Sequence, residues 1–264
     1  MLIAGYILSV VIGISLGLIG GGGSILTVPI LVYLFGISAT LATGYSLFIV
    51  GITALTGAVK YHRLGLIKLN KAFLFAIPSL ASLVITRRFL LPAIPEVVWS
   101  TPGFTITKDI LIMTVFAILM VTASVSMIRK GREDKETGKT SPLIIAITGL
   151  AIGVLTGFLG AGGGFLIVPA LVFFAGLNMK QSVGTSLFII AFNSLLGFLH
   201  DVLNGELIDY TLLLTISACA IAGMMAGIAM SHKIPGNKLK PAFGWFVLLM
   251  GIYVLAREAF VSFE

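Results

Sequence analysis

Long apolar stretches separated by short polar breaks run through the whole chain. A helix rises 1.5 Å per residue, so about 20 apolar residues cross the hydrocarbon core of a bilayer. Stretches of at least that length predict membrane-spanning helices. They cover residues 2–35, 37–60, 69–90, 107–128, 142–175, 178–200, 209–231 and 240–262.

Composition indicates the same class of protein. Hydrophobic residues make up 58% of the chain and charged residues 10%, and the mean hydropathy is +1.12. A soluble domain carries roughly 25% charged residues, so this chain lacks the polar surface that water requires. We therefore predict an all-α integral membrane protein in contact with the lipid bilayer. The first stretch has neither a basic leader nor a small-residue cleavage site, so we expect a retained span.

The charge and the cysteine content exclude several functions. The net charge of +7 does not indicate nucleic-acid binding, because the basic residues fall in short loops, where they set membrane orientation. The single cysteine, Cys219, excludes an internal disulfide and a cysteine-based metal cluster. No metal-ligand spacing occurs, and no predicted span has a carboxylate near its centre. We expect no metal, no cofactor and no catalytic residue, which leaves a membrane enzyme or its partner subunit as the weakest hypothesis.

One segment of the chain occurs twice. Residues 13–65 return at 153–205 without a gap, 140 positions later, and GLIGGGGSILTVP at 17–29 becomes GFLGAGGGFLIVP at 157–169. Paired, interrupted hydrophobic segments are typical of transporters built from internal repeats. We divide the chain into a first transmembrane repeat (1–130), a cytoplasmic linker (131–141) and a second transmembrane repeat (142–264).

The first stretch of each repeat is too long for one span. As a helix, the 34 residues of 2–35 would reach about 51 Å, against a hydrocarbon core of roughly 30 Å. Glycines in a helix interior cost about 1 kcal/mol each relative to alanine. We predict helices that end at Ile19 and Leu159, a glycine loop, and shorter helices from Ser24 and Gly164. Pro29 and Pro169 then act as hinges near the start of the new helices.

Loop charges predict the orientation. Residues 60–71 carry four lysines and arginines, whereas residues 200–209, their repeat counterpart, carry mainly acidic side chains. Basic loops face the cytoplasm, so the two repeats must be inverted, with both termini outside. Inversion requires that each broken segment turns back within the membrane, which gives eight to ten helical segments. Arg87 and Arg88 fall outside in this scheme and do not fit the charge rule.

The glycine breaks predict an anion site. Glycine brings backbone N–H groups close to a ligand, and a helix N-terminus carries a partial positive charge that attracts anions. The inverted breaks would face each other near the bilayer midplane, where Ser24 adds a hydroxyl donor. The alternative is close helix packing, which we favour for Gly13, Gly17, Gly153 and Gly157 because of their small-xxx-small spacing.

Polar residues within the following spans extend this prediction. Ser46 and Ser186 align between the repeats, and Asn193 is costly to bury. The alternative is that they hydrogen-bond a neighbouring helix. His200 and Asp201 could relay protons, whereas Lys60, His62, Arg87 and His200 at span ends are expected to snorkel to the interface. The predicted substrate-binding residues are Gly20, Gly21, Gly22, Gly23, Ser24, Ser46, Gly160, Gly162, Gly163, Gly164, Ser186 and Asn193.

The twin glycine-rich breaks, each followed by a proline, resemble those of the sulfite exporter TauE/SafE family over essentially the whole chain. The resemblance implies a multi-pass transporter for sulfite, sulfonates, sulfoacetate or related organic anions. It also implies that residues 20–24 and 160–164, with Pro29 and Pro169, are the signature hinges. Ser24 stands opposite Gly164, and Ala161 interrupts the second glycine run, which could tune the anion that fits.

The function predicted from these features is an alternating-access transporter of small anions in the cytoplasmic membrane of a prokaryote. Export is the favoured direction, because an anion leaving a negative-inside cell gains about 2.3 kcal/mol per charge per 100 mV. The alternatives are a channel-like anion pore and an uptake permease for organic sulfonates or carboxylates. The sequence leaves the anion, the coupling ion and a homo-oligomer open.

Overall fold

Long helices account for nearly all of the computed structural model, which describes residues 2–101, 104–128, 141–160, 162–204, 208–231 and 236–261. Six helices in these ranges are long and apolar enough to cross a membrane. The prediction of an all-α integral membrane protein is confirmed. Most of the predicted linker, residues 131–140, lies outside the described ranges.

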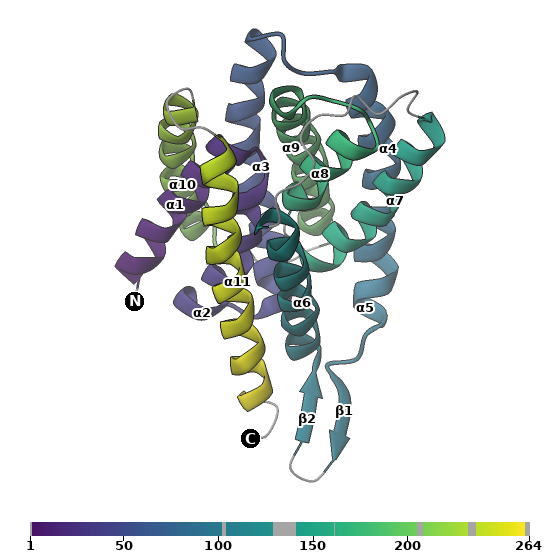
Figure 1. Ribbon diagram of the computed structural model, residues 1–264. Helices are drawn as coiled ribbons and strands as arrows, with labels where there is room; N and C mark the ends of the chain where they lie inside the picture. Colours follow the sequence, from purple (N-terminus) through teal and green to yellow (C-terminus); the bar gives the residue numbers. More distant parts are fainter. Residues whose placement is uncertain are drawn as a thin grey trace.

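The first half of the chain contains the elements α1 (Leu2–Ile19), the 3₁₀ helix η1 (Gly22–Leu26), α2 (Thr27–Phe35), α3 (Ala39–Arg63), α4 (Leu69–Ile85), the π-helical turn η2 (Thr86–Leu90), α5 (Leu91–Ala93), β1 (Val97–Thr101), β2 (Phe104–Thr107) and α6 (Lys108–Ile128). α4, η2 and α5 form one continuous helix of 25 residues. The antiparallel hairpin β1–β2, which the sequence did not predict, projects from the lower end of the bundle in Figure 1.

The second half contains α7 (Pro142–Leu159), α8 (Gly164–Phe173), α9 (Met179–Leu203), α10 (Tyr210–Ser231) and α11 (Gly236–Val261). The bounds of α7 and α9 equal those of α1 and α3 shifted by 140 positions. The sequence repeat is therefore also a repeat of secondary structure. With α4, η2 and α5 counted as one helix, the described residues form ten helical segments apart from η1, within the predicted eight to ten.

Both long segments break where the sequence predicted. α1 ends at Ile19 and α7 at Leu159, and the next residues, Gly20 and Gly160, have φ angles of 77° and 66°. Such left-handed backbone ends helices and favours glycine. α8 begins at Gly164 as predicted.

The helix predicted from Ser24 starts differently. Ser24 lies in the 3₁₀ helix η1, and α2 begins only at Thr27. Pro29 consequently falls in the first turn of α2, where its missing N–H costs no intrahelical bond. Pro169 lies inside α8.

Helices α3 and α9 form the centre of the bundle. They are its most enclosed spans, because 72% of the residues in an apolar 18-residue stretch of each helix are buried. They run antiparallel: a Cβ atom on Gly44, Gly51 or Gly57 of α3 would contact Asp201, Leu195 or Leu187 of α9, in that order. Because α3 and α9 are the same element of the two repeats, this is the relative direction that an inverted duplication requires.

The outer helices pair across the two halves. α1 packs on α10 and α7 on α4, while α6 packs on α11. These pairings are symmetric between the halves. If α1, α4 and α6 are exchanged with their equivalents α7, α10 and α11, the same three pairs result. Gly13 and Gly17 lie against the α10 backbone, and Gly153 and Gly157 lie against α4. For these four glycines the packing interpretation is confirmed.

Candidate functional site

The two glycine breaks meet in the interior. The backbones of Gly21 and Gly164 are in contact, and a Cβ atom on either residue would collide with the other's main chain. Gly20 lies against Val183 of α9, and Gly160 lies against the Thr43 backbone of α3. The structure thus brings together the two predicted breaks, and it leaves no space for a ligand between Gly21 and Gly164 in this conformation.

Two of the predicted hydroxyl groups bond to the first break. Ser24 Oγ donates to the Gly21 carbonyl oxygen at 2.8 Å. Ser186 Oγ lies 2.6 Å from the Gly20 carbonyl oxygen and 2.9 Å from that of Val183. In this conformation both side chains hold the break in shape.

Other buried polar groups, at predicted site residues or next to them, lack a partner among the described residues. Ser46 Oγ, Ser194 Oγ and the amide oxygen of Asn193 are fully enclosed and accept or donate no hydrogen bond there. Ser194 Oγ would lie 3.2 Å from a Cβ atom at Gly162, beside the second break. The Asn193 amide nitrogen donates to Ser79. A buried polar group without a partner costs about 1–3 kcal/mol, and in native proteins such groups often serve a function.

A cavity lies elsewhere, between α3, the α4–η2–α5 helix and α9. It has a volume of about 440 Å³. Among the described residues, three cationic side chains line it, Arg87, Arg88 and Lys108, together with the imidazole of His200 and one carboxylate, Asp201. None of the predicted substrate-binding residues lines it.

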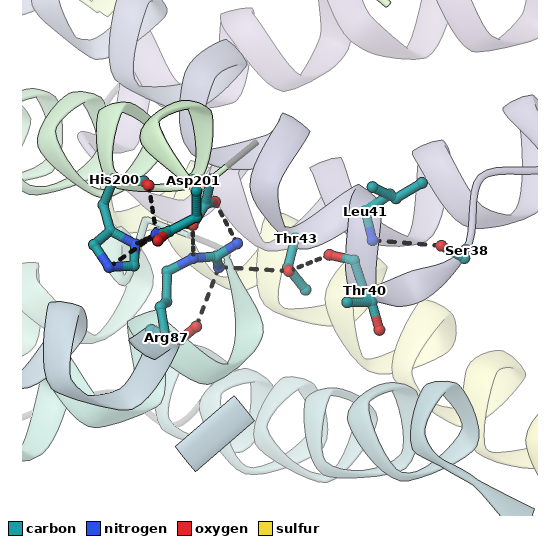
Figure 2. Close-up of polar contacts among 9 residues, drawn as sticks. Ser38, Thr40, Leu41, Thr43, Arg87, His200 and Asp201 are labelled. Atoms are coloured by element: carbon teal, nitrogen blue, oxygen red, sulfur yellow. Dashed lines mark hydrogen bonds and ion pairs between the residues drawn. The ribbon is translucent and has the colours of Figure 1, made fainter. Parts of the chain in front are cut away.

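At the floor of this cavity, Arg87 and Asp201 form a buried ion pair. Arg87 Nε donates to Asp201 Oδ1 at 2.7 Å and Nη2 donates to Oδ2 at 2.5 Å. The two side chains are only 5% and 10% exposed. Arg87 Nη1 donates to the Gly157 carbonyl oxygen at 3.2 Å and lies 3.5 Å from Thr43 Oγ1. Figure 2 shows the guanidinium between Asp201 and Thr43.

The sequence interpretation of these residues was wrong. Arg87 was expected to snorkel at a span end, but the helix continues through η2 to Ala93 and encloses it. Asp201 was assigned to the polar break after residue 200, but α9 continues to Leu203. Asp201 is therefore buried within α9, although it lies in the last turn of the helix and not near its centre. One signal in the sequence could have pointed to this pair. An arginine and an aspartate each adjoin a long apolar stretch, and a charge that is buried there requires a partner of opposite charge.

The ion pair connects the cavity to the second break. Thr43, beside the Arg87 guanidinium, also lies against Gly160. Gly157, which accepts a hydrogen bond from Arg87, precedes Gly160 by one helical turn. Thr43 and Gly157 thus link the ion pair to the second break.

Comparison with known sequences shows the family of this chain. A sequence model of the sulfite exporter TauE/SafE family matches residues 6–254. This chain belongs to the TauE/SafE family. The resemblance inferred from the glycine breaks is thereby confirmed.

Relatives of this TauE/SafE protein cover nearly its whole length. A probable membrane transporter protein of Xylella fastidiosa is 28% identical over 256 residues, which is 94% of this chain and 92% of the relative. The probable membrane transporter protein YdhB of Bacillus subtilis is 28% identical, with 92% of this chain and 96% of YdhB covered. The Arabidopsis thaliana sulfite exporter TauE/SafE family protein 5 matches 33% of this chain, covering 20% of its own length, at 29% identity. No solved structure matches.

A second cavity of this TauE/SafE protein, of about 350 Å³, lies between the end of α2, the start of α6 and the end of α11. Tyr33 donates to Glu258 Oε1 at 2.6 Å, and the Arg257 guanidinium lies 4.1 Å from the Tyr33 ring centre. The sequence interpretation did not identify this cluster. Across the described residues, no three His, Cys, Asp or Glu side chains are grouped to hold a metal ion.

Proposed function

We propose that this protein transports small anions of the sulfite and organosulfonate class across the cytoplasmic membrane. Transport proceeds by alternating access of two inverted halves around the glycine breaks. The observation that carries this proposal is the basic cavity whose floor residue, Arg87, bonds to the main chain one turn before the second break. A cavity lined by cations attracts anions and raises their local concentration.

The helix arrangement supports inverted halves. The equivalent helices α3 and α9 run antiparallel through the centre, as the contacts of Gly44, Gly51 and Gly57 demonstrate. In transporters built from inverted repeats, the substrate binds at the repeat interface near the bilayer midplane, often at the N-termini of broken helices. Here α8 of the second broken segment begins at Gly164, which contacts Gly21 of the first break, and η1 and α2 follow Gly21 in the first half.

The breaks are closed in this conformation and open during transport. Gly21 and Gly164 are in contact, so an anion binds between the breaks only after the halves move apart. The hydroxyl groups of Ser46 and Ser194, unpartnered within the described structure, then become donors to the anion. Exchange between this closed arrangement and an open one is the rigid-body movement that alternating access requires.

Loop charge supplies the orientation. With the basic segment 60–71 at the cytoplasm, the start of α3 and the ends of α4 and α9 face outside, and the cavity with them. In the export direction, the membrane potential favours the release of a negatively charged substrate to the outside by about 2.3 kcal/mol per charge per 100 mV.

The test is sulfite flux in proteoliposomes under an imposed potassium-diffusion potential. Sulfite efflux should rise when the lumen is made negative and should vanish in protein-free vesicles. A flux that ignores both the sulfite gradient and the potential contradicts the proposal.

The position of the cavity favours one further candidate, uptake of organic sulfonates or carboxylates. The basic cavity lies on the proposed outer side, where it would capture an external anion. Measuring flux of sulfoacetate in both directions, with the orientation of the reconstituted protein determined, separates uptake from export.

A further inference from the structure

The Arg87–Asp201 pair has the geometry of an occupied anion site. The guanidinium presents two parallel N–H groups to the two carboxylate oxygens, at 2.7 Å and 2.5 Å. This fork recognises any group with two oxygens at similar spacing, including sulfonate and sulfite as well as carboxylate. Asp201 thus occupies the position on Arg87 that an oxyanion from the cavity would take.

The equivalent place in the second half of the structure holds no ion pair among the described residues. The sequence repeat maps Asp201 onto Tyr61. Gly157 contacts Leu83 and Thr86 where its equivalent Gly17 contacts Met224 and Gly227, so α4 and α10 correspond with an offset of 141 and Arg87 corresponds to Ile228. Gly44 contacts Asp201, whereas its equivalent Gly184 contacts the Tyr61 ring. Tyr61 and Ile228 are both buried, so uncharged side chains fill the equivalent place at the other end of the α3–α9 pair.

The remaining basic groups of the cavity are only weakly neutralised. Arg88 has one long contact, 3.4 Å, to the Asn204 amide oxygen. Lys108 lies 4.0 Å from Glu96, whose side chain is 89% exposed, and at that exposure the pair contributes little. An anion that enters the cavity therefore meets the exposed Arg88 and the buried Lys108 and Arg87, of which only Arg87 has a close carboxylate partner in the described structure.

We propose that Asp201 closes the path from the cavity to the second glycine break, and that a substrate oxyanion opens it by replacing the Asp201 carboxylate on Arg87. The released carboxylate turns toward His200, whose Nδ1 lies 3.5 Å from Asp201 Oδ1. Arg87 then carries the anion next to Thr43 and Gly157, at the residues that hold Gly160. Arg87 is thus a substrate-binding residue and Asp201 is its internal competitor. This inference rests on the proposed function.

Titration calorimetry of the purified protein with sulfite and sulfoacetate tests the competition. Asp201→Asn removes the competing charge and keeps the shape, so both anions should bind about tenfold more tightly, equivalent to about 1.4 kcal/mol. Asp201→Glu keeps the charge and should bind as the wild type does. The double variant Arg87→Gln/Asp201→Asn, which leaves no unpaired buried charge, should melt near the wild-type temperature but show no binding.

Arg63→Gln is the charge-matched control, because Arg63 lies exposed at the opposite end of α3 and does not line the cavity. Its dissociation constant should stay within about threefold of the wild type, as expected for a solvated charge. If Asp201→Asn weakens binding, or if the folded double variant binds as well as the wild type, the competition is overturned.

Chloride tests the same idea on the unaltered protein. A spherical ion cannot replace both carboxylate oxygens, so chloride should bind at least about tenfold more weakly than sulfite at equal ionic strength. Equal affinities overturn the inference. If the wild-type protein transports sulfite but Asp201→Asn binds it with unchanged affinity, only the competition is refuted. If the wild-type protein neither transports nor binds sulfite, the proposed function is refuted as well.

Discussion

Gly21 and Gly164 lie main chain against main chain where the two broken segments meet. A Cβ atom on Gly21 would come within 2.8 Å of the Gly164 Cα, and one on Gly164 within 2.7 Å of the Gly21 Cα. Gly21 has a φ of 168°, which is extended backbone open to any residue. Glycine is therefore required at Gly21 by lack of space, and the contact joins the two halves at the proposed site.

Gly21→Ala should destabilise the protein by about 1–3 kcal/mol, the usual cost of forcing an extra carbon into a packed interior. Sulfite flux should fall with it, because the added methyl group keeps the breaks from closing. Thermal unfolding in detergent and proteoliposome flux measure the two effects.

Gly36→Ala is the matched control for that substitution. Gly36 has a φ of 71° but nothing within 4 Å of the added carbon, so only backbone strain of roughly 1–2 kcal/mol is expected. Flux should persist in this variant. Normal flux and normal melting of Gly21→Ala would show that the contact between the breaks has no role in transport.

Ser194→Ala and Ser186→Ala should separate binding from folding. Ser194 Oγ is buried without a partner in the described structure, so its removal should keep or raise the melting temperature and weaken sulfite binding. Ser186→Ala loses the bond to the Gly20 carbonyl oxygen and should cost about 1 kcal/mol of stability. Calorimetric titration and thermal unfolding of both variants provide the measurements, and unchanged sulfite affinity in Ser194→Ala would contradict its proposed role.

Breaking the ion pair on one side should harm stability more than removing both charges. Arg87→Gln leaves a carboxylate that is 10% exposed and unpaired, at an expected cost of about 3 kcal/mol. Adding Asp201→Asn should recover most of that loss, because no buried charge remains. A double-mutant cycle on unfolding free energies measures the coupling. Additive losses would mean that the two side chains do not stabilise each other.

Membrane orientation can be tested by cysteine labelling in a Cys219→Ser background. Trp99 in the β hairpin is 62% exposed and Leu64 after α3 is 51% exposed, so cysteine at either position is reachable. An impermeant thiol reagent added to intact cells should label Trp99→Cys but label Leu64→Cys only after lysis. The opposite pattern would reverse the proposed orientation and place the basic cavity on the inner side.

Local chemistry made the broken segments predictable. The glycine runs and the length limit of a single span are properties of neighbouring residues, so the helix ends at Ile19 and Leu159 could be located without coordinates. The 3₁₀ start of the second piece, which shifts α2 to Thr27, could not, because it depends on how η1 packs against α1 and α8.

The ion pair that lines the cavity depends on two residues that are far apart in the sequence. Arg87 and Asp201 are 114 positions apart. Arg87 ends a long apolar stretch, where interfacial snorkelling is the ordinary expectation, and Asp201 begins a polar break in the sequence. Only the packing of α4 beside α9, with η2 carrying the helix past Arg87, encloses both side chains and makes each the partner of the other.

The amino-acid sequence by itself determined the membrane class, the duplication, the family and the two breaks, because hydropathy, glycine and repeat spacing are encoded in consecutive residues. The tertiary structure alone decided which polar groups share a site. Burial of a charge is stabilised only by a partner brought from elsewhere in the chain, and that partner exists only once the helices are assembled.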